Sequence, residues 1–192
     1  YSQNTAVIWA AHWGQLTCLE TLLDHGALAD LKDNSGNTAL MNAAIYNYPD
    51  IAGEQMVRQA DVNIVNNEKK TALQLAEEKN NQDVVRILKA GNNKEILNKE
   101  ILAAAGEGRQ RLVYGLVTAG ADLETRDEDE NTAIHLSVHM GHESVVRILL
   151  QLGIDVNIRG QNNWTPLMTA ANYGQHKIAK LLVRSGASLN LQ

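Results

Sequence analysis

The chain has 192 residues, of which 44% are hydrophobic and 20% are charged, so its apolar content suffices for a globular core. Its formal net charge is −5, and it lacks the excess of Lys and Arg that a phosphate backbone requires, so nucleic acid is not an expected partner. No apolar run reaches the roughly 18 residues of a membrane span, so no membrane partner is expected. A single cysteine cannot form an internal disulfide, which favours an intracellular, cytoplasmic location.

An internal repeat begins at Thr5, in the segment NTAVIWAAHWG, and returns at Thr38 and Thr71 with a spacing of 33 residues. Each unit carries two runs of apolar residues at helical spacing with a break between them, which predicts two helices joined by a turn. The threonine is expected to be the N-cap of the first helix. Gln74 lies three residues after Thr71 and completes a capping box.

The first two units carry local expectations of their own. Cys18 occupies the position that apolar residues fill in the other units, so we expect it to be buried. In the second unit, Gly53 and Gln55 lie where the second helix should be apolar, and we expect that helix to be short or irregular. Asn47 and Gln59 replace the glycines that end helices in other units.

The fourth unit starts near Lys99, only 28 residues after Thr71, so it is shorter than the period by about the length of one loop. Thr132 and Thr165 then mark the fifth and sixth units at the full spacing of 33 residues. Six units are therefore predicted.

The segments TPLMTAANYGQHKIAKLLVRSGASLN (165–190), TAIHLSVHMGHESVVRILLQLGIDVN (132–157) and GNTALMNAA (36–44) resemble ankyrin repeats, and the resemblance covers essentially the whole chain. It implies an all-α solenoid of stacked helix-turn-helix repeats, with β-hairpin fingers that project between repeats. It also implies a concave face made of the finger tips and the first helices.

The short fourth unit affects the predicted domain organisation. The third repeat resembles a C-terminal cap and the fourth an N-terminal cap, and the two meet near Gly91 to Lys94 without a finger. We therefore expect repeats one to three in residues 1–91 and repeats four to six in residues 94–192. Two abutting arrays, a permuted or engineered array, and a longer natural protein trimmed at both ends remain open as explanations.

Three histidines, His135, His139 and His142, are the strongest candidates for chemistry, since two of them lie four residues apart on one helix face. The resemblance assigns His135 and His142 to structural hydrogen bonds, so no metal and no cofactor is expected. No nucleophile with a base and no phosphate-binding loop stands out, and the protein is predicted not to be an enzyme.

The residues seven and eight positions after each repeat threonine, together with the finger tips, lie on the concave face according to the resemblance. Several are aromatic residues, histidines or methionine, which suit a protein interface. The predicted partner-binding residues are His12, Trp13, Tyr46, His139, Met140, Trp164 and Tyr173, with Asp127, Glu128 and Asp129 at an acidic finger tip that would steer a basic partner.

The predicted function is a non-catalytic module that binds a protein or peptide on this concave face. Two alternatives remain open. In the first, the chain is a structural or assembly element that self-associates through its uncapped first and sixth repeats. In the second, it is the targeting region of a larger enzyme or effector.

Overall fold

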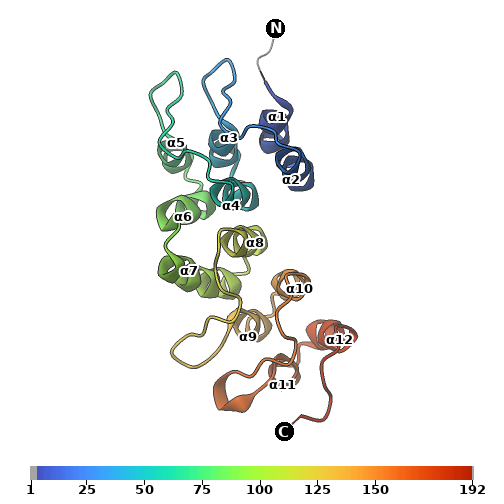
Figure 1. Cartoon of the computed structure of the whole chain (residues 1–192). Coiled ribbons are helices and arrows are strands. Elements are labelled where there is room, and N and C mark those ends of the chain that lie inside the picture. The colour runs from blue at the N-terminus through green and yellow to red at the C-terminus, as the bar shows by residue number, and fades with distance from the viewer. Residues whose placement is uncertain (1–3, 192) are drawn as a thin grey trace. The chain divides into compact units, whose positions relative to one another are not determined.

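The computed structural model describes residues 4–191 and has an all-α fold (Figure 1). This described part contains twelve α-helices and one short 3₁₀ turn, and the predicted all-α class is confirmed. The helices are α1 (Ala6–His12), α2 (Leu16–Asp24), α3 (Ala39–Tyr46), α4 (Pro49–Val57), α5 (Ala72–Glu78), α6 (Gln82–Ala90), α7 (Lys94–Gly106), α8 (Gln110–Thr118), α9 (Ala133–His139), α10 (Glu143–Gln151), α11 (Pro166–Asn172) and α12 (His176–Arg184), with the 3₁₀ turn η1 (Gln161–Asn163) before α11.

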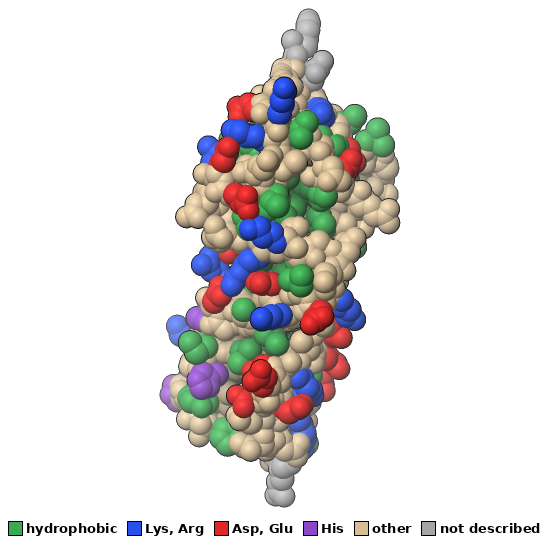
Figure 2. Space-filling view, turned by 90° about the vertical axis from the view of Figure 1, so that its left-hand side faces the viewer, with side chains coloured by type: hydrophobic (Ala, Val, Ile, Leu, Met, Phe, Trp, Pro, Cys, Tyr) green, Lys and Arg blue, Asp and Glu red, His purple; other side chains and the backbone are tan. Residues whose placement is uncertain are grey.

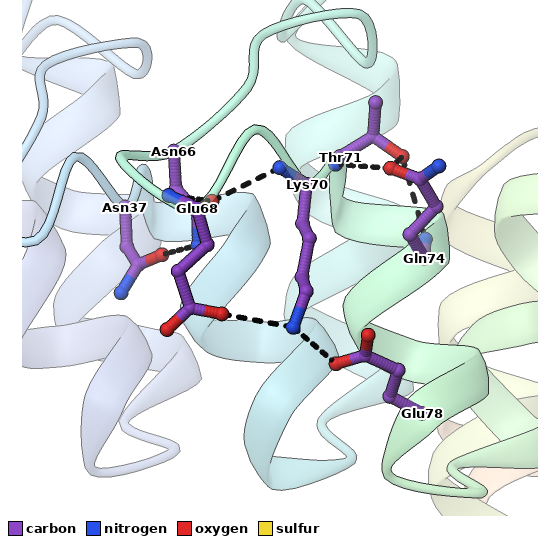
Figure 3. A network of polar contacts seen from close by, with 7 residues as sticks. All are labelled: Asn37, Asn66, Glu68, Lys70, Thr71, Gln74 and Glu78. Carbon is purple, nitrogen blue, oxygen red and sulfur yellow. Dashed lines mark hydrogen bonds and ion pairs between the residues drawn. The ribbon is translucent and has the colours of Figure 1, made fainter.

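The repeat threonines start the first helices of their repeats, as predicted. Thr5 and Thr38 accept hydrogen bonds at 3.3 Å from the backbone N–H groups three residues later. Thr71 does the same, and its own N–H donates to Oε1 of Gln74 at 2.9 Å, which closes the predicted capping box (Figure 3).

The predicted fingers are tight loops rather than paired strands, because the described residues contain only one isolated bridge, between Arg126 and Thr132. In the finger that begins at Asn66, the backbone N–H of Asn66 donates to the carbonyl of Lys70 at 3.0 Å, and its side chain accepts from the N–H groups of Glu68 and Lys70 at 3.0 Å (Figure 3). Such local bonds close a loop without a ladder.

Ion pairs tie the same finger to the helix that follows it. Nζ of Lys70 lies 2.8 Å from Oε2 of Glu68 and 2.9 Å from Oε2 of Glu78, as Figure 3 shows. These hydrogen bonds raise the pKa of Lys70 and lower that of Glu68. All three side chains are solvent-accessible, so the contribution to stability is small.

Contacts divide the chain into two compact units, each with its own core. Unit 1 comprises residues 4–97 and 114–120, and unit 2 comprises residues 98–113 and 121–191, so α7 and α8 each contribute to both. The largest fully buried side chains of unit 1 are Ile8, Leu19, Leu40, Met41, Ile51, Ile87, Leu97 and Leu116, and those of unit 2 are Ile101, Leu112, Ile134 and Leu149.

The helix expected to be short or irregular, α4, is a regular helix of nine residues, so that prediction is wrong. Gly53 of α4 lies against Gly115 of α8 so closely that a Cβ on Gly53 would collide with the carbonyl oxygen of Gly115. A Cβ on Gly115 would collide with the carbonyl oxygen of Pro49. The helix lacks an apolar stripe at this point because it packs backbone against backbone.

The second half of α8 also carries a polar contact in unit 1. The hydroxyl of Tyr114 donates to Oε1 of Glu20 in α2 at 3.2 Å. Burial raises the pKa of Tyr114, with the charge of Glu20 as a further cause, so the hydroxyl keeps its proton. Residues 114–120 therefore contact both α2 and α4.

Cys18 is exposed, so its predicted burial is wrong. The corresponding residues of later repeats, such as Val84 and Val145, are fully buried. Among the described residues, none covers the side chain of Cys18 in α2. Burial at this position depends on a neighbouring repeat and not on the residue itself.

The missing finger between the third and fourth repeats is confirmed. Helix α6 ends at Ala90 and α7 begins at Lys94. Oδ1 of Asn93 accepts hydrogen bonds from the N–H groups of Glu95 at 3.0 Å and Ile96 at 3.3 Å, so this side chain caps the new helix directly.

Candidate functional site

A cleft with a volume of about 530 Å³ lies in unit 2, between two finger loops and helices α9 and α11. One wall comes from the loop 127–131 and another from residues 161–164. Six of the predicted partner-binding residues line this cleft, namely Asp127, Asp129, His139, Met140, Trp164 and Tyr173.

The 33-residue period explains why the apolar lining gathers here. Met140 and Tyr173 occupy the same position in consecutive repeats, directly after α9 and α11, and their exposed fractions are 57% and 48%. The rings of His139 and Tyr173 contact each other with centroids 4.3 Å apart and a tilt of 56°. This contact restricts the motion of Tyr173 before any partner arrives.

His135 holds the two sides of the cleft in register. Its Nδ1 accepts the N–H of Thr132 at 3.4 Å, so Nε2 carries the proton and donates to the carbonyl of Trp164 at 3.1 Å. The ring also lies against Gly160, where a Cβ would come within 2.9 Å of it. Burial lowers the pKa of His135, so the neutral form that makes both bonds is favoured.

The acidic loop is built around Asp127. Its Oδ1 accepts the backbone N–H groups of Asp129 at 3.0 Å and Asn131 at 2.8 Å, so this carboxylate closes the loop tip. Oδ1 of Asp129 accepts from Nε2 of Gln161 at 3.3 Å, which connects the two fingers. Glu128 is exposed and does not line the cleft.

The guanidinium groups of two arginines on these fingers form hydrogen bonds with backbone carbonyl groups. Nη1 of Arg126 donates to the carbonyls of Glu130 at 2.8 Å and Arg159 at 2.7 Å, and Nη1 of Arg159 donates to the carbonyl of Asn163 at 2.8 Å. Among the described residues that line the cleft there are two carboxylates and no Lys or Arg. The fixed charge of the lining is therefore negative.

The remaining predicted residues, His12, Trp13 and Tyr46, form a separate aromatic cluster in unit 1. The ring of His12 lies edge-on to Trp13 at 5.0 Å and to Tyr46 at 4.5 Å, measured between centroids. Its Nδ1 lies 3.3 Å from Oδ1 of Asn42, whose Nδ2 donates to the carbonyl of Thr38 at 3.0 Å, so Nδ1 carries the proton. The predicted aromatic, histidine and methionine contacts thus fall into two clusters, one in each unit.

The structural roles expected for two histidines are confirmed. His135 makes the bonds described above, and Nε2 of His142 bonds to the carbonyl of Gly106 at 2.9 Å. Within residues 4–191, no three or more His, Cys, Asp or Glu side chains are grouped so that they could hold a metal ion.

Sequence reasoning missed several residues of the cleft. Gln161 and Asn162 line it from the finger tip, and Leu136 and Thr169 line it from α9 and α11. Gln161 and Asn162 could have been predicted from the sequence, because they lie just before Trp164. They also occupy the same part of their finger as the acidic residues 127–129 occupy in the preceding one. Nothing in the sequence distinguished Leu136 and Thr169 from other residues of their helices.

A family model for ankyrin repeats in three copies matches residues 2–54 and 101–192 of the chain. The chain belongs to the ankyrin-repeat family. Ankyrin repeats generally mediate protein–protein interactions. The stretch 55–100, which lies outside this match, contains the third repeat and the fingerless junction.

Two further observations concern the surface of this ankyrin chain. None of the helices within residues 4–191 combines the length and apolar content needed to cross a bilayer. On the face that Figure 2 shows, basic and acidic side chains are interspersed, and histidine and hydrophobic side chains adjoin one another toward the C-terminal end. This face presents no extended basic patch of the kind that binds nucleic acid.

Proposed function

We propose that the chain is a non-catalytic binding module that holds a segment of a partner protein, or a peptide, in the cleft of unit 2. One observation carries the proposal: six residues that the sequence predicts as partner contacts, three from repeat positions and three from finger tips, line one cleft. Its volume of about 530 Å³ lies within the range of pockets that bury a ligand.

The chemistry of the lining supports a protein ligand. Trp164, Tyr173 and Met140 are each between 38% and 57% exposed, so they lose solvent contact when a partner binds. Large, partly exposed aromatic and thioether side chains are typical anchors of protein interfaces. Acidic and amide groups at the rim add polar contacts, and they favour a basic segment.

The arrangement is also pre-organised. His135 fixes the backbone of Trp164, and His139 contacts the ring of Tyr173. Less conformational entropy is lost on binding when the anchors are already held in place. We include the cluster of His12, Trp13 and Tyr46 in unit 1 as a second, separate contact surface.

Selection from a random-peptide display library tests the proposal. We expect binders whose affinity falls at least tenfold in Tyr173→Ala and in Met140→Ala, about 1.4 kcal/mol or more each, because an anchor is removed. Leu28→Ala is the matched control: it truncates a side chain that is 66% exposed and belongs neither to the cleft nor to the cluster in unit 1, so it should leave the affinity within twofold. Trp13→Ala is measured beside it to test the second surface. Thermal melting checks that all variants fold.

Binders that are insensitive to both cleft variants would overturn the proposal. A set that depends on Trp13 instead would move the binding site to the cluster in unit 1.

A second candidate function is assembly through uncovered repeat faces. Val183 in α12 is 44% exposed and Leu189 is 69% exposed, and such apolar residues favour association with another repeat. A molar mass that rises above 21.0 kDa with concentration in light scattering would favour this function over peptide binding. A role as the targeting region of a larger enzyme, and a cytoplasmic location, remain hypotheses.

A further inference from the structure

We propose that the cleft of unit 2 selects an arginine side chain of the bound segment, with its guanidinium between the carboxylate of Asp129 and the aromatic wall of Trp164 and Tyr173. The inference rests on the proposed function and names the chemistry of the ligand at that site. It is drawn from the charge, the acceptors and the walls of the cleft.

Charge is the first argument. Asp127 and Asp129 line the cleft, and the guanidinium groups of Arg126 and Arg159 on the same fingers donate to backbone carbonyls. These bonds fix both guanidinium groups on the fingers, and neither arginine is part of the lining of the cleft. A cation supplied by the ligand complements the negative lining.

The carboxylates are held in place before binding. The carboxylate of Asp127 accepts hydrogen bonds from two backbone N–H groups, and that of Asp129 accepts one from the side-chain amide of Gln161. A positioned carboxylate suits the fixed fork of a guanidinium, which forms paired hydrogen bonds of defined geometry. A lysine ammonium gains less from such geometry, because it acts as a point charge.

Neighbouring amides supply further acceptors. Because Nε2 of Gln161 donates to Asp129, its Oε1 remains an acceptor, and the side chains of Asn131 and Asn162 also line the cleft. A guanidinium has five N–H donors and needs several acceptors, whereas an ammonium has three. Oδ1 of Asn131 also accepts the backbone N–H of Gln161 at 3.4 Å, and the carboxylate and amide oxygens of the lining suit a ligand group with several donors.

The opposite wall suits the rest of the arginine side chain. Trp164 and Tyr173 present partly exposed rings, and Met140 adds a thioether. A guanidinium stacks on aromatic faces, and the apolar stem of arginine packs along apolar surface while its charged end reaches polar groups. Acceptors and rings around one cleft thus fit both parts of this side chain.

The test uses the full chain and the peptides selected from the display library. Each enriched peptide is compared with versions in which its arginine is replaced by lysine or by citrulline, which keeps the shape of arginine without its charge. We expect the enriched peptides to contain arginine, citrulline to weaken binding at least tenfold, and lysine to weaken it at least threefold.

A matched pair of protein variants locates the contact. Asp129→Asn removes one carboxylate of the cleft and keeps an acceptor for Gln161, whereas Glu128→Gln removes the adjacent charge outside the cleft. We expect Asp129→Asn to weaken binding at least tenfold and to abolish the preference for arginine over citrulline. Glu128→Gln should stay within twofold of the unmodified chain.

The outcomes separate this inference from the proposed function. Peptides that depend on Tyr173 but tolerate citrulline, or bind Asp129→Asn with unchanged affinity, overturn the arginine inference alone. Equal losses in Asp129→Asn and Glu128→Gln also overturn it, because they indicate only the general charge of the loop. A library that yields no Tyr173-dependent binder overturns both proposals.

Discussion

At the scale of single residues, His135 connects the stability of unit 2 with the shape of the cleft. It is 3% exposed and bonds to Thr132 at the start of α9 and to Trp164 in the next finger. The bond from Thr132 requires Nδ1 without a proton, and the bond to Trp164 requires a proton on Nε2, so only the neutral ring protonated on Nε2 makes both. Protonation of Nδ1 would remove the acceptor for Thr132 and place a charge in a buried position.

This requirement predicts a pH dependence. Burial lowers the folded-state pKa of His135 below its ordinary value of 6.5, so its contribution to stability is complete above pH 6.5. As the pH falls below that value, the unfolded chain binds the proton first and stability is lost, by at most about 1.4 kcal/mol per pH unit for one group.

Urea unfolding between about pH 8 and pH 5 measures this loss. The unmodified chain should lose more stability toward low pH than His135→Gln does, although the variant is less stable by about 1–2 kcal/mol at neutral pH. His139→Gln, an exposed change on the same helix, should keep the full pH dependence. Equal pH slopes in the chain and in His135→Gln would contradict the role given to His135.

At the scale of the helices, α4 and α8 approach each other backbone to backbone at Gly53 and Gly115. Alanine usually stabilises a helix interior relative to glycine by roughly 0.5–1 kcal/mol. At Gly53 and Gly115 the sign should reverse, because the added Cβ collides with a carbonyl oxygen of the other helix.

We expect Gly115→Ala to lower the free energy of unfolding by about 2–3 kcal/mol, as overpacking of a tight contact does. Gly106→Ala is the control, since a Cβ on Gly106 meets no atom within 4 Å and its φ is not positive. That change should be neutral or stabilising by up to about 1 kcal/mol. Denaturant unfolding of both variants gives the answer, and a stabilising Gly115→Ala would disprove the close crossing.

At the scale of the whole molecule, the two units do not follow a single cut in the sequence. The sequence predicts a boundary between residues 91 and 94, whereas the core of unit 1 also contains Leu97 and Leu116. Exposure of both side chains costs about 3–6 kcal/mol. We therefore expect a fragment of residues 1–91 to be less stable than a fragment of residues 1–120 by about that amount.

Circular dichroism with denaturant titration of the two fragments measures this difference. Equal stability would support the boundary predicted from the sequence and would show that residues 114–120 contribute little to unit 1.

Local features of this protein were predictable from the sequence alone. Thr5, Thr38 and Thr71 cap their helices through bonds to N–H groups only three residues away, and the 33-residue period gives the helix pairs and the missing finger. The same period identified Met140 and Tyr173 as equivalent positions facing one side of the repeats. These features depend on residues that are close in the sequence, so the spacing of the repeat is enough to predict them.

Only the tertiary structure shows which residues from other segments each side chain or backbone contacts. Gly53 and Gly115 are far apart in sequence, so no local pattern indicated that two backbones would touch there. Cys18 has the pattern of a buried residue, but its burial depends on a neighbouring repeat. The cleft likewise requires residues 161–164 to lie opposite residues 127–131, because burial and recognition arise from contacts between segments that the sequence keeps apart.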